Sequence, residues 1–80
     1  MIDLFEINHF LLFLKKEYPE IEVKTMYNPI SEMVRVKISK KYDSLFYDIP
    51  AISTGYVIER INDAFIDYLA SISRMITNER

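Results

Sequence analysis

The single histidine, His9, is the first residue to test for catalysis or metal binding. Glu6 lies three positions before it and would be its neighbour on a helix, whereas Asp3, six positions before, would not. One such pair does not make a metal site, because zinc is held by three or four protein ligands. The chain has no cysteine and one glycine, which excludes a cysteine-based metal site and a glycine-rich phosphate loop. We therefore expect no enzyme, no metal and no cofactor, and a small catalyst or ligand binder is the weakest of three function classes.

Three carboxylates, Glu59, Asp63 and Asp67, recur at every fourth position in the last third of the chain. On a helix this spacing places them in one row, which is typical of a solvated face. Binding of a metal ion or a basic partner at this row is the alternative. At the start of the same segment, Ser53 or Thr54 can supply the N-cap oxygen of a helix. The alternative is anion binding by the free backbone N–H groups of Ser53, Thr54 and Gly55.

The carboxylate row belongs to the most regular element of the sequence, a helix predicted over residues 53 to about 78. Apolar residues on its other side recur at steps of three and four: Ile58, Ile61, Phe65, Leu69, Ile72 and Ile76. A helix of about 25 residues is roughly 37 Å long, whereas a strand of about six residues reaches only about 20 Å. We therefore expect this helix to lie across a small sheet and to extend past it. Its exposed end, around residues 74–80, is a second candidate binding surface.

A first helix is predicted over residues 2 to 18, because Pro19 disfavours helical backbone at the residue before it. One side carries a core stripe: Leu4, Ile7, Leu11, Leu14 and Tyr18, bordered by Phe10. The opposite side is also apolar: Ile2, Phe5, Leu12 and Phe13, with His9 in the middle and Lys16 at the end. A helix with two apolar sides is buried on both, and an 80-residue domain has little to cover the second. We therefore predict a protein interface made of Phe5, His9, Leu12, Phe13 and Lys16; the alternative is a sheet that curls over both sides.

Three segments between the helices alternate in hydrophobicity, as half-buried strands do: residues 21–27, 33–39 and 45–49. Short polar connections join them, which favours an antiparallel meander. The predicted fold is a single α+β domain over residues 1–80, in the order αβββα, with a three-stranded sheet packed against two helices. Its inward-facing strand residues would be Val23, Val34, Val36, Ile38, Leu45, Tyr47 and Ile49. The other face would carry charges together with Met26, Met33 and Phe46.

The composition sets limits on the partner and the location. The net charge is −2 with charges of both signs interspersed, whereas nucleic-acid and membrane-surface binders are usually basic. The longest apolar run, residues 10–14, is too short to cross a bilayer, and Asp3 and Glu6 near the start do not fit a signal peptide. We expect a cytoplasmic protein. Twelve isoleucines against three alanines indicate an AT-rich gene, as in a low-GC bacterium or a phage or plasmid within one.

The predicted order of elements also resembles that of double-stranded RNA-binding domains. Asn28-Pro29 falls in the first strand connection, where that family commonly has Gly-Pro. The family grips phosphates with lysines at the start of its last helix, but this sequence has Ser53 to Tyr56 there, followed by Glu59. The resemblance implies a topology and leaves a nucleic-acid-binding module as the alternative function. Its contacts would be the basic residues of the strands and turns: Arg35, Lys37, Lys40 and Lys41.

The function that the sequence favours is a small non-enzymatic protein-interaction domain, of the adaptor or inhibitor kind, encoded by a phage or mobile element. Its partner would be a second copy, giving a dimer through the first helix, or another protein. No nucleic acid, membrane or small-molecule substrate is expected.

Overall fold

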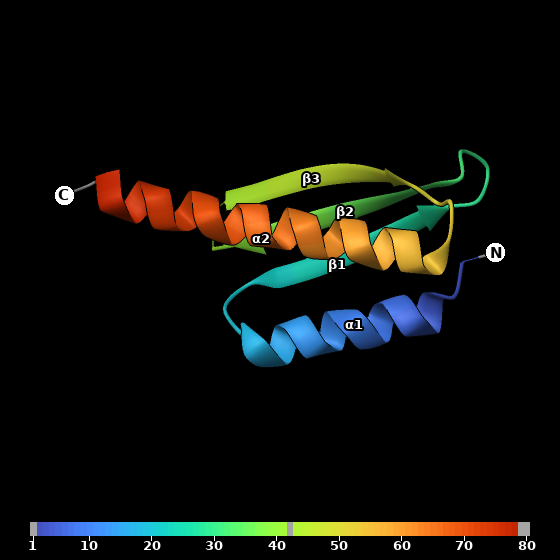
Figure 1. The fold of residues 1–80 in the computed structure, drawn as a ribbon, viewed down its shortest axis with the longest axis horizontal. Helices are drawn as coiled ribbons and strands as arrows, with labels where there is room; N and C mark the ends of the chain where they lie inside the picture. Colours follow the sequence, from blue (N-terminus) through green and yellow to red (C-terminus); the bar gives the residue numbers. More distant parts are fainter. Residues whose placement is uncertain (1, 42, 79–80) are drawn as a thin grey trace.

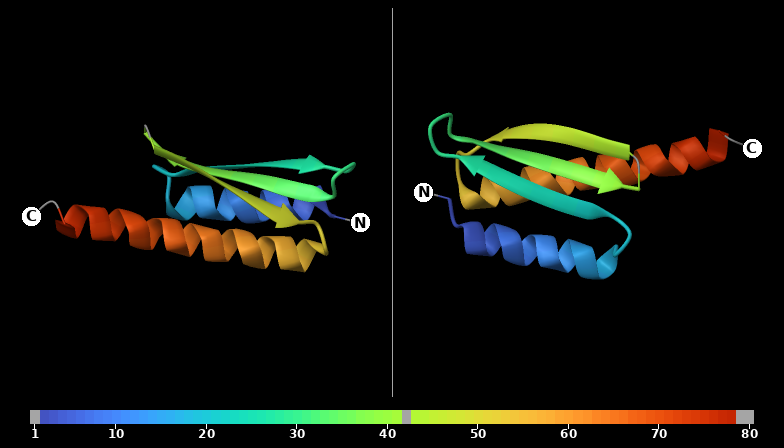
Figure 2. Two further views of the ribbon diagram at one scale, coloured as in Figure 1. Left: turned by 90° about the horizontal axis from the view of Figure 1, so that it is seen from above. Right: turned by 180° about the vertical axis from the view of Figure 1, so that it is seen from behind.

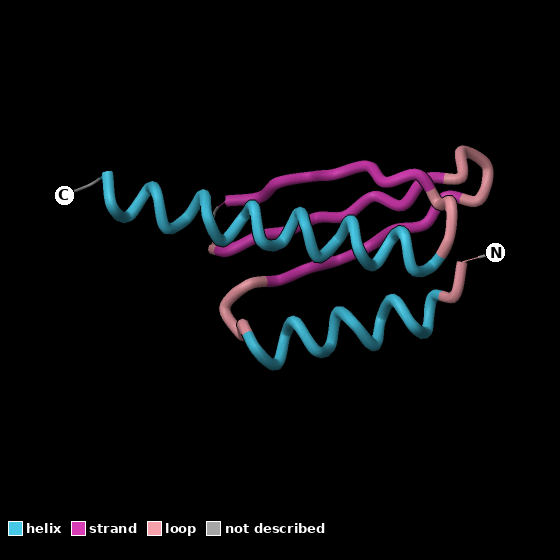
Figure 3. The backbone as a smooth tube through the Cα atoms, viewed as in Figure 1, coloured by secondary structure: helices cyan, strands magenta, loops and turns pink. Residues whose placement is uncertain are grey.

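The computed structural model describes residues 2–41 and 43–78, with side chains as far as Ile72. Figure 1 shows a helix, three strands and a second helix, which confirms the predicted αβββα order. The elements are α1 (Leu4–Glu17), β1 (Glu22–Asn28), β2 (Met33–Lys40), β3 (Asp43–Pro50) and α2 (Thr54–Asn78). The same order can be followed by type of secondary structure in Figure 3.

The sheet is the predicted antiparallel meander, with strand order β1-β2-β3. Val36 in the central strand lies opposite Thr25 on one side and Tyr47 on the other. The β1–β2 turn is held by Asn28, whose Oδ1 accepts hydrogen bonds from the N–H groups of Ile30 and Ser31 at 2.9 and 3.3 Å. An asparagine that bonds the backbone two residues on is a common turn device.

Both helices cover the same face of the sheet, as Figure 2 shows from above. α1 packs beside β1, whereas α2 crosses β2 and β3 and extends past the ends of the strands (Figure 1). The core between the layers is apolar, and the residues buried most completely are Ile7, Val34, Val36, Ile38, Val57, Ile61 and Phe65. The predicted packing of two helices on one face of a three-stranded sheet, with α2 lying across the strands and extending past them, is therefore confirmed.

The two helices begin side by side at one end of the molecule. Asp3 caps α1, because its Oδ1 accepts hydrogen bonds from the N–H groups of Phe5 and Glu6 at 3.0 and 3.2 Å. Ser53 caps α2 through its Oγ, which accepts from the Tyr56 N–H at 3.1 Å. The Asp3 N–H donates to Thr54 Oγ1 at 2.8 Å and so ties the two starts together. The prediction that Ser53 or Thr54 caps this helix is confirmed, since Ser53 caps it and Thr54 joins it to the start of α1.

Three of the apolar positions predicted on α1 need correction. Ile2, which was expected on the outward side, precedes the Asp3 cap and is buried in the core, so helical spacing does not apply to it. Leu4 and Tyr18, which were expected in the core, are about half exposed at the two ends of the helix. The Tyr18 ring nevertheless contacts the Phe65 ring, with 5.1 Å between centroids. Burial on α1 is therefore concentrated at its centre.

Candidate protein-interaction surface

The outward side of α1 is exposed over the whole predicted interface. Phe5, Leu12 and Phe13 are 88%, 67% and 55% exposed, and His9 and Lys16 are exposed beside them. These five residues, hereafter the α1 outer face, lie opposite Ile7 and Leu14, which the core buries. No described element covers this side, so the alternative of a sheet curling over both sides of α1 is wrong.

The α1 outer face is joined to the core through an aromatic contact. The ring of Phe13 stacks on that of Phe10, with centroids 6.4 Å apart and planes 23° from parallel. Phe10 in turn packs partly buried against the core. Stacking of this kind restricts the rotation of an exposed side chain, so part of the ordering cost of binding is already met in the free chain.

A second exposed apolar group lies on the sheet face away from the helices. Met26 and Phe46 are 72% and 60% exposed there. Between them, two hydrogen bonds from the Arg35 guanidinium to Asp48, at 2.9 and 3.3 Å, hold the pKa of this carboxyl below its usual value. The Lys37 ammonium lies 5.9 Å from the centre of the Phe46 ring. This face is therefore mixed rather than apolar, with an ion pair and a cation–ring contact beside the exposed Met26.

The four basic residues considered for nucleic acid are spread over two regions. Arg35 and Lys37 lie on the outer sheet face, engaged as described, and Lys40 and Lys41 lie at the end of β2. The Lys40 ammonium is 3.4 Å from the Glu20 carboxylate, and Lys41 is exposed. Two of the four cations are therefore paired with carboxylates, which reduces the positive potential that phosphate binding needs. Nucleic-acid binding through them stays a prediction.

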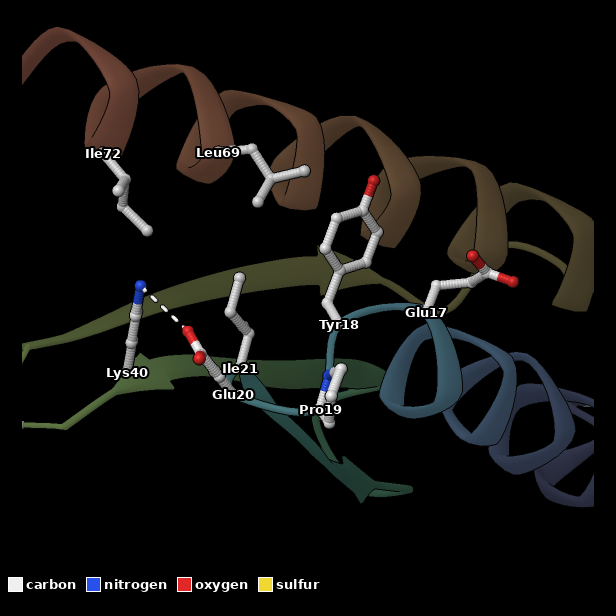
Figure 4. Close-up of a pocket in the computed structure, with 8 residues that line it drawn as sticks. All are labelled: Glu17, Tyr18, Pro19, Glu20, Ile21, Lys40, Leu69 and Ile72. Atoms are coloured by element: carbon white, nitrogen blue, oxygen red, sulfur yellow. Dashed lines mark ion pairs between the residues drawn. The ribbon is translucent and has the colours of Figure 1, made fainter.

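A pocket of about 370 Å³ opens where α1 ends, between α2 and the end of β2 (Figure 4). Leu69 and Ile72 of α2 line one wall and Ile21 lies opposite them, while the Glu20–Lys40 ion pair stands at the rim (Figure 4). An apolar interior with one ion pair suits an apolar side chain.

The carboxylate row on α2 is exposed, as a solvated face should be. Arg60 bonds the Asp63 carboxylate and lies 3.8 Å from that of Glu59, so the row is partly neutralised by its own helix. Among the described residues, no three histidine, aspartate or glutamate side chains come together as a metal site would need. The residues around 74–80, the second predicted surface, lie outside the described side chains.

One polar atom inside the fold lacks a partner among the described residues, the hydroxyl of Tyr68. Burial raises the pKa of Tyr68, and the negative charge of Asp43 adds to the rise, which the Lys40 backbone partly offsets. Because the hydroxyl is shielded from water, it cannot serve a ligand without movement of the chain. A buried hydroxyl without a hydrogen-bond partner lowers the stability of the fold by about 1–3 kcal/mol.

Three exposed isoleucines were not predicted: Ile30 in the β1–β2 turn, Ile52 after β3 and Ile66 on α2. A hydrogen bond from the Ala51 N–H to the Glu32 carbonyl, 2.8 Å long, places both turns at the same end of the molecule. For Ile30 and Ile52 a signal is present in the sequence: each follows a proline by one or two residues and lies in a predicted connection.

Comparisons with protein-family models, with curated proteins and with solved structures found no match. Neither described helix combines the length and the apolar content needed to cross a membrane. The function is therefore inferred from the surfaces of the chain itself.

Proposed function

We propose that this chain is a non-enzymatic protein-interaction domain that associates with a second copy of itself through the α1 outer face. The observation that supports it most is the exposure of Phe5, Leu12 and Phe13 on a helix whose core side is already buried. Burial of one such side chain is worth about 1.5–3 kcal/mol. Three of them on each copy form the kind of apolar centre that dominates specific interfaces, which bury about 800 Å² per partner.

The arrangement of charges favours a second copy as the partner. A twofold axis near the middle of α1 would run the two helices antiparallel, with Phe5 of one opposite Lys16 of the other. Glu6, one position along, is exposed and would lie near that lysine. At each end of the contact, Glu6 of one copy would therefore lie near Lys16 of the other. These two pairs of opposite charges favour the antiparallel orientation.

Light scattering coupled to size-exclusion chromatography tests this proposal. The wild-type chain should give a multiple of its 9.5 kDa mass, and Phe13→Glu should lower that multiple while its circular dichroism spectrum stays unchanged. Met26→Glu is the matched control, because Met26 is also an exposed apolar residue but lies on the sheet face away from the helices. A wild-type monomer at high concentration, or a Phe13→Glu variant with unchanged mass, would contradict the proposal.

We further propose an adaptor or inhibitor role in the cytoplasm of a low-GC bacterium, with a gene carried by a phage or mobile element. The isoleucine-rich composition and the small size of the chain support this origin. The genes that flank its coding sequence test it: phage or transfer genes on both sides are expected, and a stable chromosomal operon of housekeeping genes would argue against it.

A further inference from the structure

The outer edge of β3 is an unpaired strand edge. β2 occupies one side of β3, and no described strand or helix lies along the other, as the views in Figures 1 and 2 agree. The opposite edge of the sheet differs, because α1 packs beside β1. The backbone N–H and C=O groups along the free edge of β3 are therefore directed away from the sheet, where another strand can bind them.

β3 lacks most of the features by which natural proteins protect a sheet edge; its two charged residues are Asp43 at its start and Asp48, which is paired with Arg35. It runs for eight residues in unbroken register with β2, so no bulge interrupts it. It contains no lysine or arginine, and its one proline, Pro50, is the last residue. Leu45 is 43% exposed on the helix side of the edge and Phe46 is 60% exposed on the outer side. An apolar side chain therefore borders the edge on each face.

The sequence of β3 complements itself in one antiparallel register. To keep the helices of both copies on one side of a continuous sheet, residues of the same face must lie opposite one another. With Phe46 opposite Phe46, this places Leu45 opposite Tyr47 and Ser44 opposite Asp48. No like charges meet, and two aromatic rings meet at the centre, which is a favourable cross-strand pair. Registers centred on Leu45 or Tyr47 instead place Phe46 opposite Ser44 or Asp48.

The helix side of the edge has room for the second strand's side chains. A hollow of about 230 Å³ lies between the start of β3 and α2, lined by Leu45 together with Tyr68, Ser71 and Ile72 among others. In the register centred on Phe46, Tyr47 of the second copy lies opposite Leu45, at the mouth of this hollow.

We infer that two copies of the chain pair antiparallel along β3, with Phe46 at the twofold axis, to form a continuous six-stranded sheet. This contact is separate from the α1 outer face and does not depend on it. Two different self-complementary contacts on one chain close into a tetramer when their twofold axes meet at right angles, and otherwise build an open chain of subunits.

A cysteine placed at the axis tests the contact directly, because the natural sequence has none. Directly opposed residues of antiparallel strands lie about 4.5–5.5 Å apart between Cα atoms, within the span of a disulfide. With oxidised glutathione as the added oxidant, Phe46→Cys should become a disulfide-linked dimer. Met26→Cys, on the same face but on β1, should remain monomeric in a denaturing gel. Equal cross-linking of the two variants would overturn the inference.

Charge variants separate this contact from the proposed α1 contact and test its register. Phe46→Lys places two lysines together at the axis, so the mass should fall, and Met26→Lys is its matched control. Ser44→Lys places a lysine opposite Asp48 and should strengthen the dimer in this register alone. Cross-linking of Phe46→Cys in a Phe13→Glu background should persist. If the chain does not associate through α1, Phe13→Glu should leave the mass unchanged. If the chain does not associate through β3, Phe46→Lys should leave the mass unchanged.

Discussion

α1 and α2 pack on the same face of one sheet, yet their outward sides differ in kind. The outward side of α2 carries Glu59, Asp63 and Asp67 in contact with solvent, whereas that of α1 carries Phe5, Leu12 and Phe13. The monomer fold accounts for most of α2, because its apolar side is buried and its charged side is in water, with Ile66 as one exposed apolar side chain there. It does not account for the outer side of α1. The difference is the reason that the proposed contact is placed on α1 and not on α2.

The largest expected effect on the free energy of unfolding comes from replacing phenylalanine by alanine, once on each helix. Phe65→Ala should cost about 3–5 kcal/mol, because Phe65 is buried and its loss leaves a cavity. Phe13→Ala should cost less than about 1 kcal/mol, since an exposed ring loses only its contact with Phe10. Urea unfolding followed by circular dichroism, at concentrations where the chain does not associate, measures both. Equal losses would mean that the outer side of α1 belongs to the core after all.

A smaller effect is expected at the caps, one on each helix. Asp3→Ala and Ser53→Ala should each cost about 1 kcal/mol, because each removes hydrogen bonds to first-turn N–H groups. α1 buries fewer residues than α2, so its first turn should open more readily. Hydrogen exchange should therefore rise more at Phe5 and Glu6 in Asp3→Ala than at Tyr56 in Ser53→Ala. The reverse order would show that α1 is held more firmly than its burial implies.

The smallest stability effect is expected on the two outward sides themselves. Asp63→Ala removes an exposed ion pair with Arg60, and Leu12→Ala removes an exposed leucine; each should change the unfolding free energy by less than about 0.5 kcal/mol. Their effects on association should differ. Leu12→Ala should weaken the dimer measured by analytical ultracentrifugation, and Asp63→Ala should leave it unchanged. If Leu12→Ala leaves the dimer dissociation constant unchanged, the two helices do not differ in their role in association.

The strands and the faces of the helices could be predicted because their periodicities are unambiguous. Val34, Val36 and Ile38 alternate with polar residues and are all buried. The errors lie at the helix ends. Asp3 followed three residues later by Glu6 resembles a capping box, a signal that would have placed Ile2 before the helix. Periodicity identifies a side of a helix but not how far the neighbouring layer extends along it, which is why the burial of Leu4 was overestimated.

The α1 outer face could be proposed from the sequence because a second apolar stripe is visible in it. The β3 edge could not. Whether a strand edge is open depends on where the helices cross the sheet, and no local pattern in residues 43–50 specifies that α1 packs beside β1. The exposure of Ile30 and Ile52 follows equally from the tertiary arrangement of two turns.

The hydrogen bond between Asp3 and Thr54 also bears on the order in which the chain folds. It joins residues 51 positions apart, whereas each strand pairs only with the strand next to it in the sequence. Contacts between near neighbours form quickly, because closing a short loop costs little entropy. The two hairpins can therefore form early, and the meeting of the helix starts closes the longest loop. Until it does, the apolar sides of α1 and the free edge of β3 are exposed together, in the state most open to association with other copies.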